Sequence, residues 1–154
     1  MKRHPQLVAL SWDHHHGLVL ALRIGREVSG DNDMALAGLY AHLLESWEGR
    51  LLPHFRVEQE CLLARLVRYV PEDDELISRT MRDHLRMAAL VARARDMTEP
   101  ELRRDAISRF GETLRAHIRW EEEVLFEVTQ RQLDESELVA LGRDIAERLP
   151  DVSR

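Results

Sequence analysis

Apolar residues recur every three or four positions through four long segments of the chain, as they do in helices with one buried face. The pattern predicts helices at about 5–29, 34–69, 73–97 and 100–131, followed by a shorter helix at about 136–148. These segments are rich in Leu, Ala, Arg and Glu, which favour helices. No run of alternating β-branched residues is present, so we expect no strands.

The connections between the predicted helices are short, and this limits how the helices can be arranged. Turn-forming residues cluster at 29–33, 70–74, 97–100 and 134–136. Long helices joined by a few residues lie antiparallel to one another. The sequence therefore predicts an all-α fold, an up-down-up-down antiparallel four-helix bundle with a short C-terminal extra helix. We expect one domain over 1–154, with the bundle at about 5–131.

Pro53 interrupts this pattern, because it falls inside the predicted helix at 34–69. Proline has no backbone N–H to donate, and its ring clashes with the preceding turn of a helix. We therefore expect a kink, or a break in the helical hydrogen bonding, near this residue.

Composition excludes several classes of protein. With 22 Lys and Arg against 28 Asp and Glu, the chain has a formal net charge of −6, which argues against a nucleic-acid partner. Charged residues make up 32% and hydrophobic residues 44%, as in soluble globular proteins. The single cysteine, Cys61, suits a reducing compartment. The apolar run at 7–10 is too short for a signal peptide or a membrane span, so we expect a cytoplasmic protein with no membrane partner.

The eight histidines add candidate chemistry, because several fall on the apolar faces of the predicted helices. At about 100° per residue, His54, His84 and His117 each share a face with core-type residues of their own helix. On the first helix, either His14 or His15 faces inward. His4 and His42 do not fit the pattern. The apolar residues that share these faces are Leu43, Trp47 and Leu51 for His54; Ile77, Met81, Ala88 and Val91 for His84; and Phe110, Leu114, Val124 and Val128 for His117.

The same histidines fall at one depth along the bundle. The midpoints of the four predicted helices lie near residues 17, 51, 85 and 115, each within three or four residues of a candidate histidine. Antiparallel packing, at about 1.5 Å of rise per residue, then brings the histidines to one level. Glu58 and Glu121 each follow one of them by four residues, so each HxxxE pair shares one helix face. Bound cations would remove the cost of burying these two glutamates.

Each signal has an ordinary structural explanation when it stands alone. One inward histidine is commonly a hydrogen-bonded core residue, and one HxxxE pair is commonly an exposed contact on a helix. Four inward histidines at one level, two of them followed by glutamate, instead favour a metal site. Imidazole and carboxylate suit iron, manganese or zinc, and this set is too large for one tetrahedral zinc. Ferritin-like di-iron bundles use ExxH pairs, which this sequence lacks.

Four motifs follow one another along nearly the whole chain. They are LSWDHHHGLVLA at 10–21, HFRVEQECLL at 54–63, DHLRMAAL at 83–90 and HIRWEEEVLF at 117–126. Together they resemble the hemerythrin-like (HHE cation-binding) domain family. The resemblance implies a four-helix bundle that holds a non-haem, oxo- or hydroxo-bridged centre of two iron ions. The ligand types would also allow zinc or manganese as substitutes.

The resemblance also implies roles for single residues. Glu58 and Glu121 match the carboxylates that bridge the two irons, and Glu122 competes with Glu121 for that role. The implied terminal ligands are His54, His84 and His117, together with one of His14 and His15.

One position departs from the oxygen-carrying members of the family. Those proteins have two histidines a turn apart on the third helix, whereas the residues four before and four after His84 are Thr80 and Ala88. Each iron is then left with about two histidines and the bridging carboxylates. The open positions favour reaction or sensing over reversible oxygen carriage.

These observations lead to one functional hypothesis and one alternative. The hypothesis is a non-haem di-iron protein that binds or senses O2, NO or peroxide, or handles iron; no further catalytic acid or base marks it as a dedicated enzyme. The alternative is a structural or regulatory interaction module in which metal only staples the bundle. In that case the tail helix at 136–148 packs on a partner or on a second copy of the chain, as in a homodimer.

Overall fold

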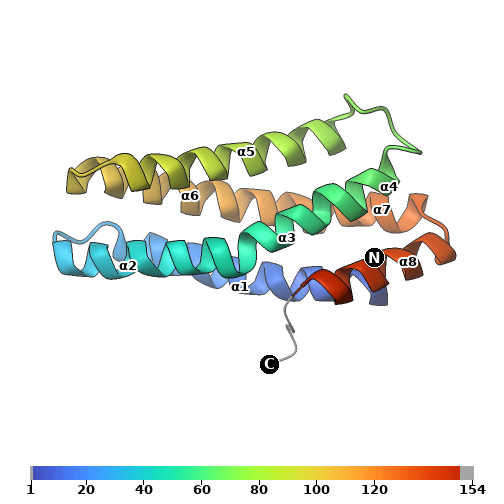
Figure 1. The fold of residues 1–154 in the computed structure, drawn as a ribbon, viewed down its shortest axis with the longest axis horizontal. Helices are drawn as coiled ribbons and strands as arrows, with labels where there is room; N and C mark the ends of the chain where they lie inside the picture. Colours follow the sequence, from blue (N-terminus) through green and yellow to red (C-terminus); the bar gives the residue numbers. More distant parts are fainter. Residues whose placement is uncertain (1, 150–154) are drawn as a thin grey trace.

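The computed structural model describes residues 2–149, which form a bundle of helices without a strand in that range (Figure 1). The all-α prediction is therefore confirmed. The element η1 is a short 3-10 helix, and η2, η3 and η4 are π-helical turns that continue the helices before and after them. The elements are η1 (Pro5–Leu7), α1 (Val8–Glu27), α2 (Asp33–Ser46), η2 (Trp47–Leu51), α3 (Leu52–Val57), η3 (Glu58–Leu63), α4 (Ala64–Leu66), α5 (Glu75–Asp96), α6 (Pro100–Trp120), η4 (Glu121–Leu125), α7 (Phe126–Gln132) and α8 (Glu135–Arg148).

The long helices lie side by side, and each contacts its neighbours along the bundle. The helix α6 packs against both α1 and α5, and α1 also contacts α2 (Figure 1). The last helix, α8, folds back against η1, α1 and α3. Polar side chains define three of the helix starts, because Asn32, Asp74 and Asp134 accept hydrogen bonds from free N–H groups in the first turns of α2, α5 and α8.

The interruption predicted at Pro53 is present as a π-helical turn. Pro53 lies in the first turn of α3, directly after η2, and the N–H of Leu52 donates to the carbonyl of Trp47, five residues earlier. This wider turn takes up the irregularity without ending the helix.

The π-helical turn η4 changes which residues face inward after it. A π turn holds one extra residue, so the faces beyond it advance by one position. Val124 is 38% exposed and Val128 is half-buried, whereas Leu125 and Thr129 are buried. The prediction that Val124 and Val128 share the buried stripe of His117 was therefore wrong.

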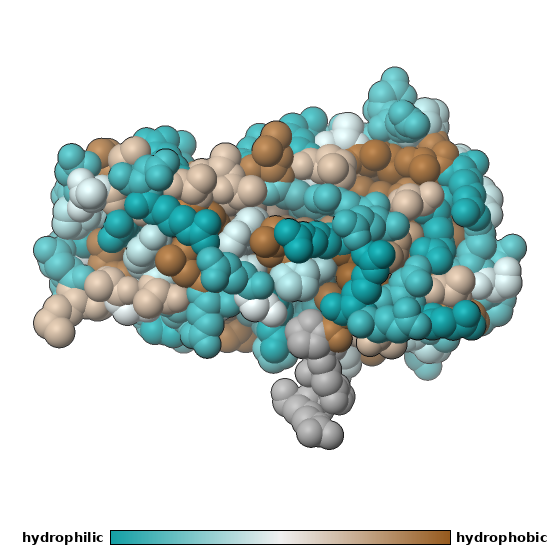
Figure 2. All heavy atoms as spheres, viewed as in Figure 1, coloured by the Kyte–Doolittle hydropathy of each residue, from teal (hydrophilic) through white to brown (hydrophobic). Residues whose placement is uncertain are grey.

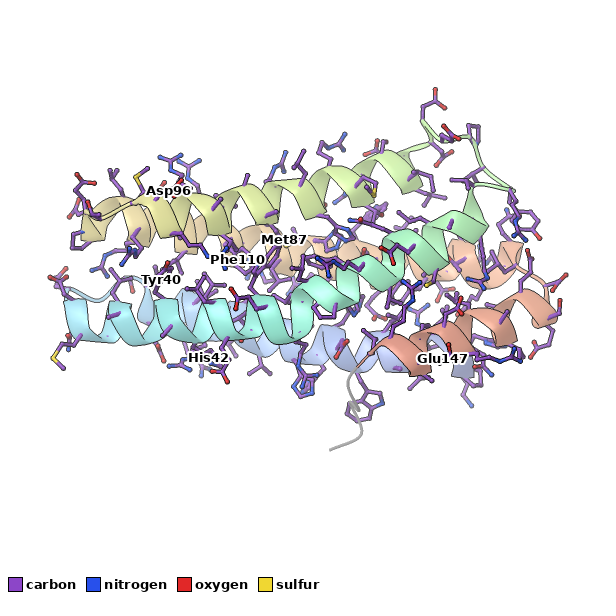
Figure 3. All side chains as sticks on the ribbon, in the orientation of Figure 1. Tyr40, His42, Met87, Asp96, Phe110 and Glu147 are labelled. Carbon is purple, nitrogen blue, oxygen red and sulfur yellow. The ribbon has the colours of Figure 1, made fainter. Side chains whose placement is uncertain are left out.

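The interior contains two apolar cores at different heights along the bundle. One is built from α1, α2, η2, α3, α5 and α6. It includes Met87 and Phe110, which lie between the helices, whereas His42 lies on the outer side of α2 (Figure 3). The other lies around the start of α1 and includes Leu141 and Ile145 of α8. The apolar face of the tail helix is thus buried within its own chain.

Two glycines of α1 and α6 differ sharply in the space around them, which gives a matched pair of substitutions. A Cβ on Gly111 would lie 2.8 Å from Cγ2 and 3.2 Å from Cβ of Ile24, whereas a Cβ on Gly25 would meet nothing within 4 Å. We expect Gly111→Ala to lower the free energy of unfolding by about 1–2 kcal/mol, since overpacking outweighs helix propensity. Gly25→Ala should raise it by up to about 1 kcal/mol. Urea unfolding measures both, and equal shifts would contradict the close approach of α1 to α6.

Polar residues cover much of the surface in the view of Figure 2, with apolar residues scattered among them. Within residues 2–149, no helix combines the length and the apolar character needed to cross a membrane.

Candidate metal centre

Six buried polar side chains lie together between the two apolar cores. They come from every long helical segment, and each is at most 4% exposed. Each of these polar residues lies on the same helix face as apolar residues one or more turns before and after it. Burial of that face in the core also buries the polar side chain. The six residues are His14 on α1, His54 on α3, Glu58 at the start of η3, His84 on α5, His117 on α6 and Glu121 at the start of η4.

The six side chains form two overlapping groups of possible metal ligands. His14 and His54 belong to one group, and His84 and His117 belong to the other. Glu58 and Glu121 belong to both groups. Within each group the ligand atoms lie within 4.8 Å of one another. The arrangement therefore suits two cations that share two carboxylates.

Each carboxylate directs one oxygen to each side of the centre. Oε1 of Glu58 lies 3.0 Å from Nε2 of His54, and its Oε2 lies 3.2 Å from Nε2 of His84. Oε2 of Glu121 lies 3.0 Å from Nε2 of His14, and its Oε1 lies 3.0 Å from Nε2 of His117. Two atoms that bind one ion at about 2.1 Å and at right angles lie about 3 Å apart, so these spacings suit ligands of a common ion.

Several of these atoms are buried without a hydrogen bond, which tests whether a cation fits. Both oxygens of Glu58 and of Glu121, and Nε2 of His84 and of His117, make no hydrogen bond although their neighbours are near. A buried polar atom left in this state costs free energy. Cations between the two carboxylates would satisfy all of them, so the residues fit a pair of metal ions.

The outward nitrogen of each histidine, Nδ1, lies beside a polar side chain. Three of these side chains, those of Asp13, Asp83 and Gln59, were not predicted from the sequence. Nδ1 of His54 lies 3.2 Å from Asp13, which also pairs with Arg50 at 2.9 Å. Nδ1 of His117 lies 3.4 Å from Asp83, an ion-pair distance, and makes no hydrogen bond there. Such partners orient the ring so that Nε2 faces the metal. The sequence does contain a signal for them, because each aspartate directly precedes one candidate histidine and contacts a different one. Asp13 precedes His14, and Asp83 precedes His84.

The other two histidines are held by the residues that follow the shared carboxylates. Nδ1 of His14 lies 2.7 Å from Oε1 of Glu122, and Nδ1 of His84 lies 2.9 Å from the side-chain amide of Gln59. The two halves of the centre therefore repeat the same plan with one difference. Beside His14 the partner is a carboxylate, whereas beside His84 it is a neutral amide.

Charges within the centre compensate one another even without a metal. Burial lowers the pKa of His54, but Glu58 and Asp13 outweigh it and raise this pKa to about 9. Burial also opposes the charged form of His117, but Glu121 and Asp83 raise its pKa to about 9. Burial favours protonation of Glu58, yet the histidines around it hold its pKa well below the usual range. Cation binding to these histidines would therefore compete with their protonation.

The structure distinguishes the alternatives that the sequence left open. His14 is buried in the centre, whereas His15, the next residue along α1, is exposed and lies beside His16. Glu121 contributes its carboxylate to the interior, whereas Glu122 contacts the outer nitrogen of His14. The inclusion of His15 among the ligand candidates is therefore corrected, because one step along a helix turns a side chain by about 100°.

Asp83→Asn should weaken cation binding on the His84–His117 side by about 10–100-fold, because an amide orients the His117 ring without a charge. Titration with a competing chelator measures this affinity. Asp105→Asn is the matched control, since Asp105 pairs with Arg109 on the surface of α6. Equal affinities of the two variants would contradict the role of Asp83.

Comparison with known families gives an independent view of this centre. Residues 7–129 match the model of the hemerythrin HHE cation binding domain. The match begins just before α1 and ends within α7, so it includes all six residues of the centre and leaves α8 outside. No curated protein and no solved structure matched the chain. Because the matched segment covers most of its length, the chain belongs to the hemerythrin HHE cation-binding domain family.

Proposed function

We propose that the chain is a non-haem di-iron protein that binds O2, NO or peroxide in a sensing, scavenging or iron-handling role, within an up-down-up-down four-helix bundle. The observation that carries this proposal is the pair of ligand groups that share Glu58 and Glu121. Two carboxylates common to two histidine pairs suit two ions held side by side, and a single ion would leave one pair unused.

The side chains of the centre would hold two ions and leave part of each ion free for another ligand. Each ion would have two imidazole nitrogens and two carboxylate oxygens from the protein. Iron takes further ligands beyond such a set, so positions stay open for a small molecule. When bound, a ferrous pair supplies electrons to that molecule.

Aromatic rings stack on two of the four histidines. Phe55 stacks on His84 with ring centroids 4.1 Å apart, and Phe126 stacks on His14 at 5.1 Å. Both phenylalanines are buried. These rings support the centre from both sides and give it an apolar lining.

Metal analysis with optical spectra tests the proposal. The protein reconstituted with ferrous iron without oxygen should hold about two irons per chain and gain near-UV absorption when O2 or NO is added. His14→Ala should lose iron, whereas His15→Ala should keep both ions, because the two residues are neighbours on α1 but only His14 reaches the centre.

A colourless wild-type protein without iron after reconstitution would overturn the proposal. An interaction module in which metal only staples the bundle makes a different prediction. In that case iron binds, but the spectrum stays the same when O2, NO or peroxide is added.

A further inference from the structure

A groove lies on the bundle surface between α1 and α6, and none of the six residues of the metal centre lines it. Its volume is about 670 Å³. Among the α1 residues that line it, Leu18 comes first and Val28 last, about 15 Å apart along the helix. Leu22 lies between them and is 55% exposed. A long apolar side chain of the groove therefore has more than half of its surface in water.

Small residues leave room between the two helices. Ala21 and Gly111 line the groove and are buried, whereas Gly25 lines it and is exposed. A Cβ on Gly25 would meet nothing within 4 Å, so the space beside this residue is open. The apolar face of another segment could therefore approach α1 closely here.

The charged residues of the groove are mostly arginines. Arg26 of α1, and Arg115 and Arg119 of α6, line it together with one acidic residue, Glu112, and all four are exposed. Within residues 2–149, none of the three guanidinium groups makes an ion pair or a side-chain hydrogen bond. Most other arginines of that range do. The groove thus carries excess positive charge on a chain whose formal net charge is −6.

The two helices that form the groove run in opposite directions. A Cβ on Gly17 would lie 2.7 Å from Cδ1 of Ile118, and a Cβ on Gly111 would lie 2.8 Å from Cγ2 of Ile24. Early residues of α1 therefore lie beside late residues of α6. Arg119, the last α6 residue of the groove, lies near the end where the α1 lining begins.

The positions of the arginines indicate the shape of the ligand. Arg119 lies toward one end of the groove, Arg26 lies toward the other end about 15 Å away, and Arg115 lies between them. A fatty acid has one anionic group and would leave the distant arginines without a partner. A helix of about three turns, with carboxylates beside its apolar face, would reach all three. A second copy that docked through the same face would instead bring arginines against arginines.

We propose that the groove between α1 and α6 binds an amphipathic helix of another protein, one that carries Asp or Glu beside its apolar face. Leu18 and Leu22 contact the apolar face of that helix, and the three arginines pair with its carboxylates. This interaction does not depend on metal, because no candidate ligand of the centre lines the groove. The inference therefore goes beyond the proposed function and stands apart from it.

Two synthetic peptides of about three helical turns, cross-linked to hold the helix, are the probes. Both carry a stripe of leucines, with glutamates beside it in one peptide and lysines in the other. The full chain should bind the glutamate peptide with micromolar affinity, and the lysine peptide at least about tenfold more weakly. Fluorescence anisotropy measures both affinities. No binding of the glutamate peptide, or equal binding of the two peptides, would overturn the proposal.

Reversing one charge tests the role of the arginines. Arg115→Glu should weaken binding of the glutamate peptide by about tenfold and strengthen binding of the lysine peptide. A variant that merely folds poorly would lose both peptides. Arg143→Glu is the matched control, because Arg143 is exposed on α8, outside the groove, and has no ion pair within residues 2–149. Equal effects of the two variants would contradict the proposed site.

Filling the groove tests its location. Gly25→Leu should abolish binding of the glutamate peptide, whereas Gly38→Leu should leave it unchanged. Gly38 is an exposed glycine of α2, and a Cβ there also meets nothing within 4 Å. Both variants replace a helical glycine, so both should be at least as stable as the wild type. Full peptide binding by Gly25→Leu would overturn the proposal.

Two other occupants of the groove give different results. Sedimentation that shows a wild-type dimer, dissociated by Gly25→Leu, would assign the groove to a second copy of the chain. Binding of dodecanoate but not of the glutamate peptide, lost in Gly25→Leu, would assign it to an anionic amphiphile. Either result would overturn the proposal.

Discussion

Removing the metal ions is expected to lower the melting temperature of the loaded protein by about 10–20 °C. Glu58 and Glu121 are 0% exposed, and their oxygens have no hydrogen-bond partner of their own. Ions that bind only the folded chain stabilise it by about 2.7 kcal/mol each when their free concentration is a hundred times Kd. Two ions then contribute about 5 kcal/mol, and each kcal/mol moves the melting temperature by about 2–4 °C in a domain of this size.

Thermal unfolding with and without a chelator measures this shift. The double variant Glu58→Leu with Glu121→Leu is the control, because it lacks both shared carboxylates and should not respond to the chelator. A wild-type protein that melts at the same temperature with and without its metal would contradict the expected coupling between metal binding and folding.

Glu58→Gln is expected to remove both ions, whereas His84→Ala should remove one. Glu58 belongs to both ligand groups, and His84 belongs to one of them. Glutamine has nearly the same shape as glutamate but no charge, so the fold is kept while the affinity of each ion falls more than about a hundredfold. Metal analysis after gel filtration counts the ions that remain on the chain.

Glu60→Gln provides the control for this experiment. Glu60 lies two residues from Glu58 in η3, but it is exposed and pairs with Arg148 of α8. This variant should keep both ions. If Glu58→Gln also kept both, the carboxylate would not be shared between two ions. If His84→Ala lost both, the two sides would not bind metal independently.

The helical character of the chain and most of the inward faces could be predicted from the sequence. Helices form from local contacts, and their apolar stripes repeat every 3.6 residues, so spacing alone places His54, His84 and His117 on buried faces. The same spacing brings Glu58 and Glu121 to those faces, one turn after a histidine. Chain order and helix length then bring all five residues to one level.

Other features depend on how the helices pack, and the sequence left them open. His14 and His15 differ by about 100° around one helix, and the tilt of α1 against its neighbours decides which is buried. The same holds for Glu121 and Glu122, because η4 begins at Glu121 and shifts the face that follows. Spacing within one helix does not determine these outcomes.

The sequence by itself determined an all-helical chain with four histidines and two glutamates available for metal, because those signals lie within single helices. Only the tertiary structure decided the partners of the histidines, since Asp13, Asp83, Gln59 and Glu122 each contact a ring on another helix. It also decided that Glu122 joins His14 to Arg3, whereas Gln59 lies beside His84. These contacts depend on the distances between helices, which local periodicity does not specify.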